Sequence, residues 1–140
     1  MEELSKRIQA IKEQLDFFDD ELEKYEYIID LGKKLPLLDE KYKIDKYLVQ
    51  GCTSLVWLVC EYDNAKLHFK ADSEAMIVKG LVYIVTSIFE AINISDIKDF
   101  NTDLLLSLEL NEIITPNRQS GVAGMVDKII SYAKEYDGKN

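Results

Sequence analysis

The chain has 140 residues, of which 47% are hydrophobic and 31% are charged. This composition predicts a single soluble domain over residues 1–140, large enough to bury a core without disulfide support. The net charge of -9 disfavours nucleic acids and anionic membranes as partners, because binding to phosphate groups depends on Lys and Arg.

The cellular location and the metal content can also be predicted from composition. The N-terminal residues lack the pattern of a signal peptide, and no apolar run approaches the roughly 20 residues that span a bilayer. We therefore expect a cytoplasmic protein, in which two cysteines do not imply a disulfide. Two cysteines and one histidine do not complete a four-ligand structural zinc site, and no Gly-rich phosphate loop follows a strand. We expect neither a metal nor a cofactor.

Two helices are predicted in the N-terminal part. Apolar residues at helical spacing indicate an amphipathic helix over residues 4–15. A second helix is predicted to begin near Asp19 or Asp20, with Asp20 as its cap, and to end at Gly32, with Pro36 beyond it. The predicted apolar stripe of this second helix consists of Phe18, Leu22, Tyr25 and Ile29.

Three antiparallel strands are predicted in the middle of the chain. Residues 44–49 suggest a short first strand. Residues 54–62 are apolar on both faces, which predicts a central strand covered on both sides. A turn at Asp63-Asn64 leads into residues 66–71, whose alternating pattern predicts a half-exposed strand paired with its neighbour.

Helices are predicted again in the C-terminal half. At Asp72-Ser73 the apolar period changes from 2 to 3.6, so either residue is predicted to cap a long buried helix. Gly80 inside that helix predicts the close approach of another element. Thr115 and Pro116 are predicted to open the last helix, as cap and first-turn residue. The predicted architecture is α+β, with helices packed on a small three-stranded antiparallel sheet.

The stretch around Cys52 carries the clearest chemical signal. Gly51 and Cys52 fall together at a break between a charged run and an apolar run, which predicts a tight turn that presents the thiol. Only the thiolate form of cysteine is a nucleophile. A buried, inert Cys52 is an equally good interpretation from position alone. Cys60 lies inside an apolar strand and is predicted to be inert.

The position of the single histidine limits the reactions that can be expected of a reactive cysteine in this chain. Strand alternation places His68 with lysines on the solvated face. A thiol protease is disfavoured, because it needs a base within hydrogen-bond reach of its nucleophile. Exchange of sulfur between thiols needs only a thiolate and an accessible partner sulfur.

The last predicted helix holds three further residues of interest. Arg118 lies in its first turn, where a cation opposes the helix dipole. It is predicted either to meet an anion or a carboxylate, or to be an ordinary exposed arginine. Gly121 and Gly124, further along the same helix, are predicted to allow close packing.

Two elements of the sequence are distinctive. Gly-Cys-x-Ser-x-Val-Trp begins at Gly51, and Asp-Ser-x-Ala-x-Ile-Val-Lys-Gly-Leu begins at Asp72. With residues 27–36 and 115–121, they follow one another in order through nearly the whole chain. In these stretches the sequence resembles the SufE family, the sulfur-acceptor proteins of iron–sulfur cluster assembly.

The resemblance implies an α+β fold like that of the IscU-type scaffolds, and a role as a sulfur carrier. A SufS-type, pyridoxal-phosphate-dependent cysteine desulfurase would pass persulfide sulfur to Cys52 and be stimulated by this protein. The sulfur would then go to a SufBCD-type scaffold. Gly51, Thr53 and Ser54 would form the loop and partner surface. Arg118 and Asp72 fall on positions that the resemblance marks as functional.

Other interpretations remain open at this point. The chain could be a small thiol-dependent redox protein, although such a protein usually has a resolving cysteine nearby. It could also be a docking module in which Cys52 is only packed. A scaffold role does not follow from the resemblance, because IscU-type scaffolds use three cysteines. We expect a monomer or a weak homodimer.

Overall fold

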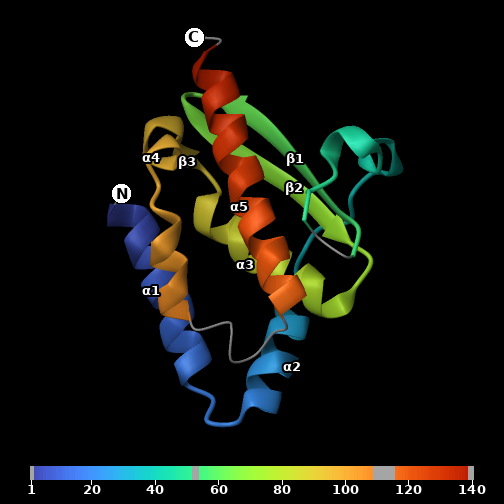
Figure 1. Ribbon diagram of the computed structural model, residues 1–140, viewed down its shortest axis with the longest axis vertical. Coiled ribbons are helices and arrows are strands. Elements are labelled where there is room, and N and C mark those ends of the chain that lie inside the picture. Colours follow the sequence, from blue (N-terminus) through green and yellow to red (C-terminus); the bar gives the residue numbers. More distant parts are fainter. Residues whose placement is uncertain (1, 52–53, 109–115, 139–140) are drawn as a thin grey trace.

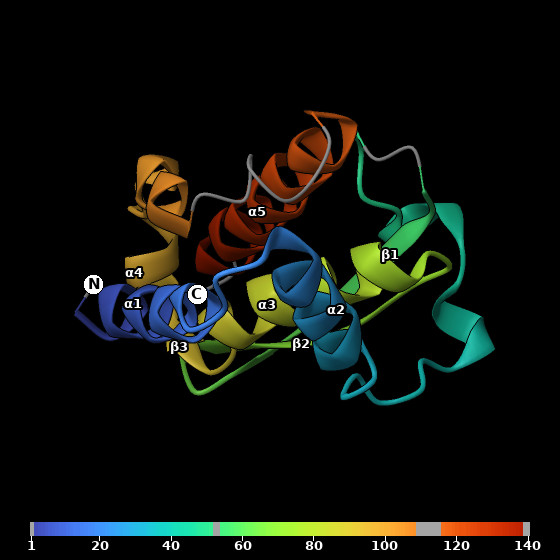
Figure 2. The ribbon, with the colours of Figure 1, turned by 90° about the horizontal axis from the view of Figure 1, so that it is seen from below.

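Helices cover one face of a small antiparallel sheet (Figure 1). The computed structural model describes residues 2–51, 54–108 and 116–138. Figure 2 shows α3 between β2 and α5, and α3 also packs against α1 and α2. This arrangement confirms the predicted α+β class. None of the helices in the described ranges combines the length and apolar character needed to cross a bilayer.

The N-terminal helices are α1 (Glu2–Asp16) and α2 (Glu21–Gly32). The prediction of Asp20 as the cap of α2 is confirmed, because its carboxylate accepts a hydrogen bond from the Leu22 N–H at 3.1 Å. The predicted apolar stripe of α2 is wrong in part. Ile28 and Leu31 are buried, whereas Leu22 is 61% exposed. The buried face of α2 is the one that meets α3, and the apolar pattern of α2 itself did not identify this face.

Helix α3 (Met76–Phe89) is the buried helix of the fold, as predicted. The predicted close approach at Gly80 is confirmed. A Cβ atom at this position would lie 2.0 Å from the carbonyl oxygen of Ile28 in α2. Two further α-helices follow, α4 (Ile94–Lys98) and α5 (Pro116–Asp137), with a 3-10 helix (Thr102–Leu108) between them. Thr115, the predicted cap of α5, lies outside the described residues. The apolar side chains of α5 that are buried are Val122, Met125, Val126, Ile129 and Ala133, and Ile130 is partly buried.

The sheet has the order β1-β2-β3. Strands β1 (Val56–Asp63) and β2 (Lys66–Ser73) form a hairpin that pairs along its whole length. Its two turn residues both have positive φ, 53° at Asn64 and 63° at Ala65, as expected for a two-residue hairpin turn. Strand β3 (Ile92–Asn93) pairs with the first two residues of β2.

Two predictions about the sheet are wrong. Residues 44–49 do not form a strand: Asp45–Tyr47 is a 3-10 helix, and Leu48 makes one isolated bridge to Trp57. The third strand is β3, which makes β2 central and places β1 at an edge. Strand β1 is nevertheless buried on both faces over its first five residues. Leu38 and the segment that follows it cover the face opposite the helices, where Leu38 packs with Trp57.

Tyrosine hydroxyls from α5 cover part of the β1 edge. Tyr132 donates a hydrogen bond to the Leu58 carbonyl at 2.7 Å, and Tyr136 donates to the Cys60 carbonyl at 3.2 Å. Burial raises the pKa of Tyr132, so its hydroxyl stays protonated and remains a donor. These bonds fix α5 against β1, and the N-terminal half of α5 then lies beside the segment that enters this strand.

Candidate functional site

The candidate site is the connection that leads into β1. Cys52 and Thr53 lie outside the described residues, so the predictions for them remain predictions. Gly51 and Ser54 flank them, and Gly51 is exposed with a φ of 87°. This left-handed conformation is one that glycine adopts without strain. The predicted turn at Gly51 therefore has the backbone conformation that its residue type favours.

The ends of this connection are held together by main-chain pairing. The Val49 N–H donates to the Val56 carbonyl at 2.9 Å, next to the bridge between Leu48 and Trp57. Val49 and Val56 are both buried. The chain thus leaves the core at Val49 and returns at Val56, with Cys52 between these two fixed points.

Helix α5 supports the first flank of the connection. A Cβ atom at Gly124 would lie 2.1 Å from the Gln50 carbonyl oxygen. A Cβ atom at Gly51 would lie 3.6 Å from the Ser120 carbonyl oxygen. The main chain at Gln50 and Gly51 therefore rests directly on the N-terminal half of α5. The prediction that Gly124 permits close packing is confirmed.

The end of β2 supports the second flank. The Ser73 hydroxyl donates to the Leu55 carbonyl at 2.8 Å, and the Glu74 N–H approaches the same oxygen at 3.4 Å. The prediction that Ser73 or Asp72 caps α3 is wrong. Both residues belong to β2, and α3 begins at Met76 without a side-chain cap. Ser73 instead fixes the second flank, a role that no local pattern indicated.

Asp72 is a buried carboxylate, 8% exposed, with two lysine partners. Its oxygens lie 3.4 Å from the Lys43 ammonium and 3.3 Å from the Lys79 ammonium. One of them also accepts the Ser73 N–H at 2.8 Å. The pKa of Lys43 is raised by its hydrogen bond to Glu40 and then by its bond to Asp72. Asp72 of β2 therefore links this strand to α3 and to the segment at Lys43 that precedes the site. It lies next to Ser73, which holds the Leu55 carbonyl.

Arg118 lies on the first turn of α5, two residues before Ser120. Its guanidinium donates to the Tyr25 hydroxyl of α2 at 3.4 Å. Arg118 thus lies at the end of α5 against which Gly51 packs. Its side chain is directed toward α2. Asp72 is linked to the site through Ser73 and through the segment at Lys43.

Cys60 is confirmed as a buried thiol, 8% exposed. Burial, and then the nearby carboxylates of Glu90, Glu135 and Glu61, raise the pKa of Cys60 to about 12. At pH 8 roughly one thiol in 10,000 is then a thiolate, because each pH unit below the pKa reduces that fraction tenfold. Cys60 is unsuited to thiol exchange at neutral pH.

This property of Cys60 can be measured in a Cys52→Ser variant, where Cys60 is the single thiol. Alkylation by iodoacetamide in the folded protein should be slow at pH 8 and should accelerate about tenfold per pH unit up to the onset of unfolding, because the thiolate is the reactive form. The same variant in concentrated urea should react at the rate of a free cysteine. A reaction rate that reaches its plateau near pH 9 in the folded state would contradict the raised pKa.

His68 has a structural partner. Its Nδ1 atom lies 2.6 Å from a Glu90 carboxylate oxygen, and the other Glu90 oxygen accepts the Phe69 N–H at 2.9 Å. His68 is partly exposed and lies on the sheet face that also carries Lys70. This placement agrees with the interpretation of His68 as a surface residue. No group of three His, Cys, Asp or Glu side chains that could hold a metal occurs within residues 2–51, 54–108 and 116–138.

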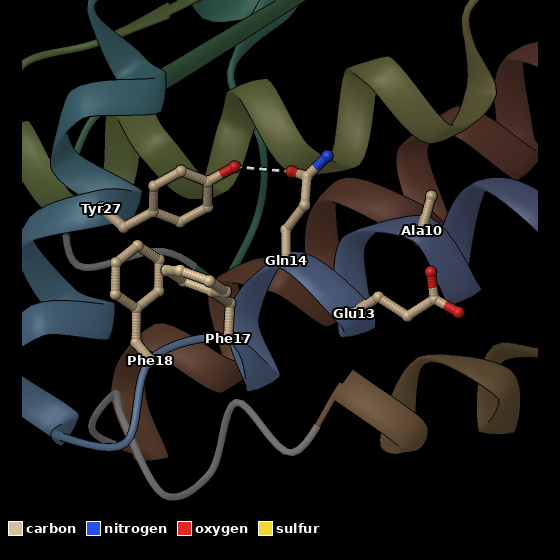
Figure 3. A pocket seen from close by; sticks show the side chains of 6 residues that line it. All are labelled: Ala10, Glu13, Gln14, Phe17, Phe18 and Tyr27. Atoms are coloured by element: carbon tan, nitrogen blue, oxygen red, sulfur yellow. Dashed lines mark hydrogen bonds between the residues drawn. The ribbon is translucent and has the colours of Figure 1, made fainter.

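A surface hollow lies away from β1, where α1 turns into α2 (Figure 3). The rings of Phe17, Phe18 and Tyr27 gather there, and the Tyr27 hydroxyl bonds to Gln14 at 2.5 Å. The residues that line this hollow include neither a thiol nor a histidine. The hollow therefore offers no group for sulfur chemistry, and the Cys52 connection remains the candidate site.

Comparisons with known proteins identify the family of the chain. The sequence matches the family "SufE: Fe-S metabolism associated domain" over residues 9–133. An uncharacterised SufE-like protein of Rhizobium meliloti strain 1021 is 36% identical over 123 residues, which cover 84% of this chain and 88% of that protein. A Wigglesworthia glossinidia brevipalpis protein named cysteine desulfuration protein SufE is 36% identical over 105 residues, covering 74% of this chain and 73% of that protein.

A structural comparison shows the same fold in a distant protein. The solution structure of a hypothetical protein from Thermus thermophilus matches with a TM-score of 0.75, over 92% of this chain and 94% of that chain. The two sequences are 14% identical, so this likeness concerns the fold alone. The family match over residues 9–133 and the two relatives at 36% identity lead to one conclusion. The chain belongs to the SufE family, the Fe–S metabolism associated domains.

Proposed function

We propose that this protein accepts sulfur as a persulfide on Cys52 from a SufS-type cysteine desulfurase. It stimulates that enzyme and delivers the sulfur to a SufBCD-type scaffold for iron–sulfur cluster assembly. The protein works in the cytoplasm, as a monomer or a weak homodimer. It is a carrier, and the pyridoxal-phosphate chemistry that releases sulfur from L-cysteine belongs to the desulfurase.

The observation that carries this proposal is the Gly51-Cys52 stretch within a SufE family match. A relative that shares 36% identity is named a cysteine desulfuration protein, which agrees with a place next to a desulfurase. The described flanks of Cys52 add physical support. Val49, Gly51 and Leu55 are each fixed against a different element, so both ends of the stretch have a defined location in the fold.

The transfer step exchanges one sulfur atom without net oxidation. The Cys52 thiolate attacks the outer sulfur of the persulfide carried by the desulfurase. The sulfur–sulfur bond of the donor breaks as a new one forms on Cys52, and the desulfurase cysteine leaves as a thiolate. This step needs neither a dedicated base nor a metal on the acceptor, and His68 is already bonded to Glu90.

The redox-protein alternative is disfavoured by the structure. A thiol redox protein usually resolves its first intermediate with a second, accessible cysteine. The other cysteine of this chain, Cys60, is buried and has a raised pKa. The docking-module alternative differs from the carrier in one respect only, namely whether Cys52 itself receives sulfur.

Intact-mass spectrometry tests the carrier proposal directly. The protein is incubated with a SufS-type desulfurase and L-cysteine without reductant, and free thiols are then blocked. We expect the mass of one added sulfur atom in the wild type and in Cys60→Ser, and none in Cys52→Ser or without the desulfurase. An unmodified wild type alongside a desulfurase that is turning over would refute the carrier role.

A further inference from the structure

The edge of β2 that faces away from β1 is only partly paired. The Leu67 carbonyl accepts the Ala91 N–H at 2.8 Å on this side, next to the pairing of Leu67 with Ile92 in β3. Main-chain groups alternate between the two sides of a strand. The N–H and carbonyl groups of Phe69 and Ala71 therefore point to the same side as those of Leu67, away from β1.

Strand β3 ends before it reaches these residues, since it pairs only with Lys66 and Leu67. The Glu90 carboxylate then takes the place of a strand residue by accepting the Phe69 N–H. Beyond Glu90, no described residue forms a main-chain or side-chain hydrogen bond with the Phe69 carbonyl or with the edge-facing groups of Ala71. The edge therefore presents free acceptors and a free donor.

Phe69 and Ala71 line a cavity of about 390 Å³. One wall is β2 at residues 69–71, and the opposite wall is the segment that follows α2. Figure 2 shows this segment passing along the β2 side of the sheet. The walls are mainly apolar, and Leu37 at the rim is 96% exposed. The lining includes Leu35, Pro36, Leu37, Leu38, Tyr42, Phe69 and Ala71.

The charged side chains and the threonine of the lining already have partners. Lys70 lies 2.8 Å from a Glu61 oxygen, Asp39 accepts the Lys41 N–H, and Thr86 donates to the Val82 carbonyl. The polar groups that remain for a ligand are thus the Tyr42 hydroxyl and the main chain of β2. A main-chain edge with apolar walls is complementary to another extended main chain, which supplies alternating donors and acceptors together with side chains for the walls.

We propose that this β2-edge groove binds a short extended segment of a partner protein, which adds as a strand beside Phe69 and Ala71. The added strand continues the line of β3, and an apolar side chain enters the cavity between Leu35 and Leu38. The free edge spans about three residues, so the isolated segment binds weakly and gains affinity from other contacts of the same partner. The proposal is independent of the chemistry at Cys52.

NMR spectroscopy of the ¹⁵N-labelled full chain tests this groove with the capped peptide acetyl-Thr-Val-Thr-Val-amide. We expect a downfield shift of the Ala71 amide proton on titration, and slower amide exchange at Ala71 by about tenfold or more, because the new strand protects it. The Lys70 amide is the internal control, since it faces β1 and is protected throughout. No change at Ala71 at millimolar peptide would overturn the proposal.

Three comparisons separate strand addition from other events. A peptide with both edge-facing amides N-methylated should leave Ala71 unchanged, and an equal response would show apolar contact alone and refute strand addition. Leu37→Lys should weaken peptide binding about tenfold, since one leucine side chain no longer contributes apolar contact. The matched change Leu22→Lys, on the exposed face of α2, should not weaken it.

The protein concentration is varied in a further experiment without peptide. Protection of the Ala71 amide that grows with protein concentration alone would identify a second copy as the occupant and overturn the proposal.

Discussion

Replacing Gly124 by alanine should slow sulfur uptake by Cys52 about tenfold or more while the protein stays folded. The new methyl group would lie 2.1 Å from the Gln50 carbonyl oxygen, whereas nonbonded carbon contacts are comfortable only beyond about 3.4 Å. The main chain at Gln50 must therefore move by about 1 Å or more. A displacement of this size at a reacting group costs up to about 100-fold in rate.

The stability cost of this change should be smaller than its effect on sulfur uptake. Overpacking a tight contact costs about 1–3 kcal/mol, and alanine recovers up to about 1 kcal/mol through its higher helix propensity. Gln50 and Gly51 are exposed, so they can shift outward without opening the core. Single-turnover sulfur uptake, measured by mass spectrometry alongside a thermal melt, separates the two effects.

Gly138→Ala is the matched control for this experiment. A Cβ atom there would meet only the Glu135 carbonyl oxygen at 3.5 Å and the Lys134 carbonyl oxygen at 3.7 Å, which are ordinary contacts. This variant should take up sulfur at the wild-type rate. If Gly124→Ala also did so, the contact between α5 and Gln50 would have no part in positioning Cys52.

A second replacement, Gly80→Ala, should destabilise the protein more than Gly124→Ala does. The methyl group would lie 2.0 Å from the Ile28 carbonyl oxygen and 2.6 Å from the Ile28 Cγ2 atom. Ile28 is fully buried, so neither its main chain nor its side chain has room to move. Helices α2 and α3 must separate, which opens the core along their whole contact.

The expected cost of Gly80→Ala is about 3 kcal/mol or more, well above the roughly 1 kcal/mol that alanine gains in helix propensity. For a chain of this size such a loss lowers the melting temperature by about 10 °C or more. Urea and thermal unfolding of the variant, with Gly138→Ala as the control, measure this. A melting temperature within about 2 °C of the wild type would show that α2 and α3 are not in the tight contact described.

Local sequence patterns predicted those helices and strands whose buried residues repeat with the period of the element itself. The helical spacing in residues 76–89 and 116–137 identified the two buried helices, and the alternation in residues 66–71 identified β2. The burial of Cys60 followed from its place in an apolar strand. In each case the signal lies within the element, because burial on one face repeats with the geometry of that element.

The sequence was less informative where two local interpretations compete. Asp72 and Ser73 have the residue types of a helix cap, yet β2 continues through both. Pairing of Val56 with Ser73 and of Trp57 with Asp72 extends the hairpin, and Lys43 and Lys79 compensate the burial of the Asp72 carboxylate. Partners that lie 29 residues before and 7 residues after Asp72 cannot be recognised from the local pattern.

Residue types and short spacings were sufficient to predict the α+β class, the turn at Gly51 and the family of the chain. The packed fold was needed to show that the third strand is Ile92–Asn93, that Ser73 holds Leu55, and that Gly124 supports Gln50. These contacts join residues that lie 18 to 74 positions apart in the sequence. Such pairings are set by the packing of the whole chain, because many local conformations fit the same short sequence and the core selects among them.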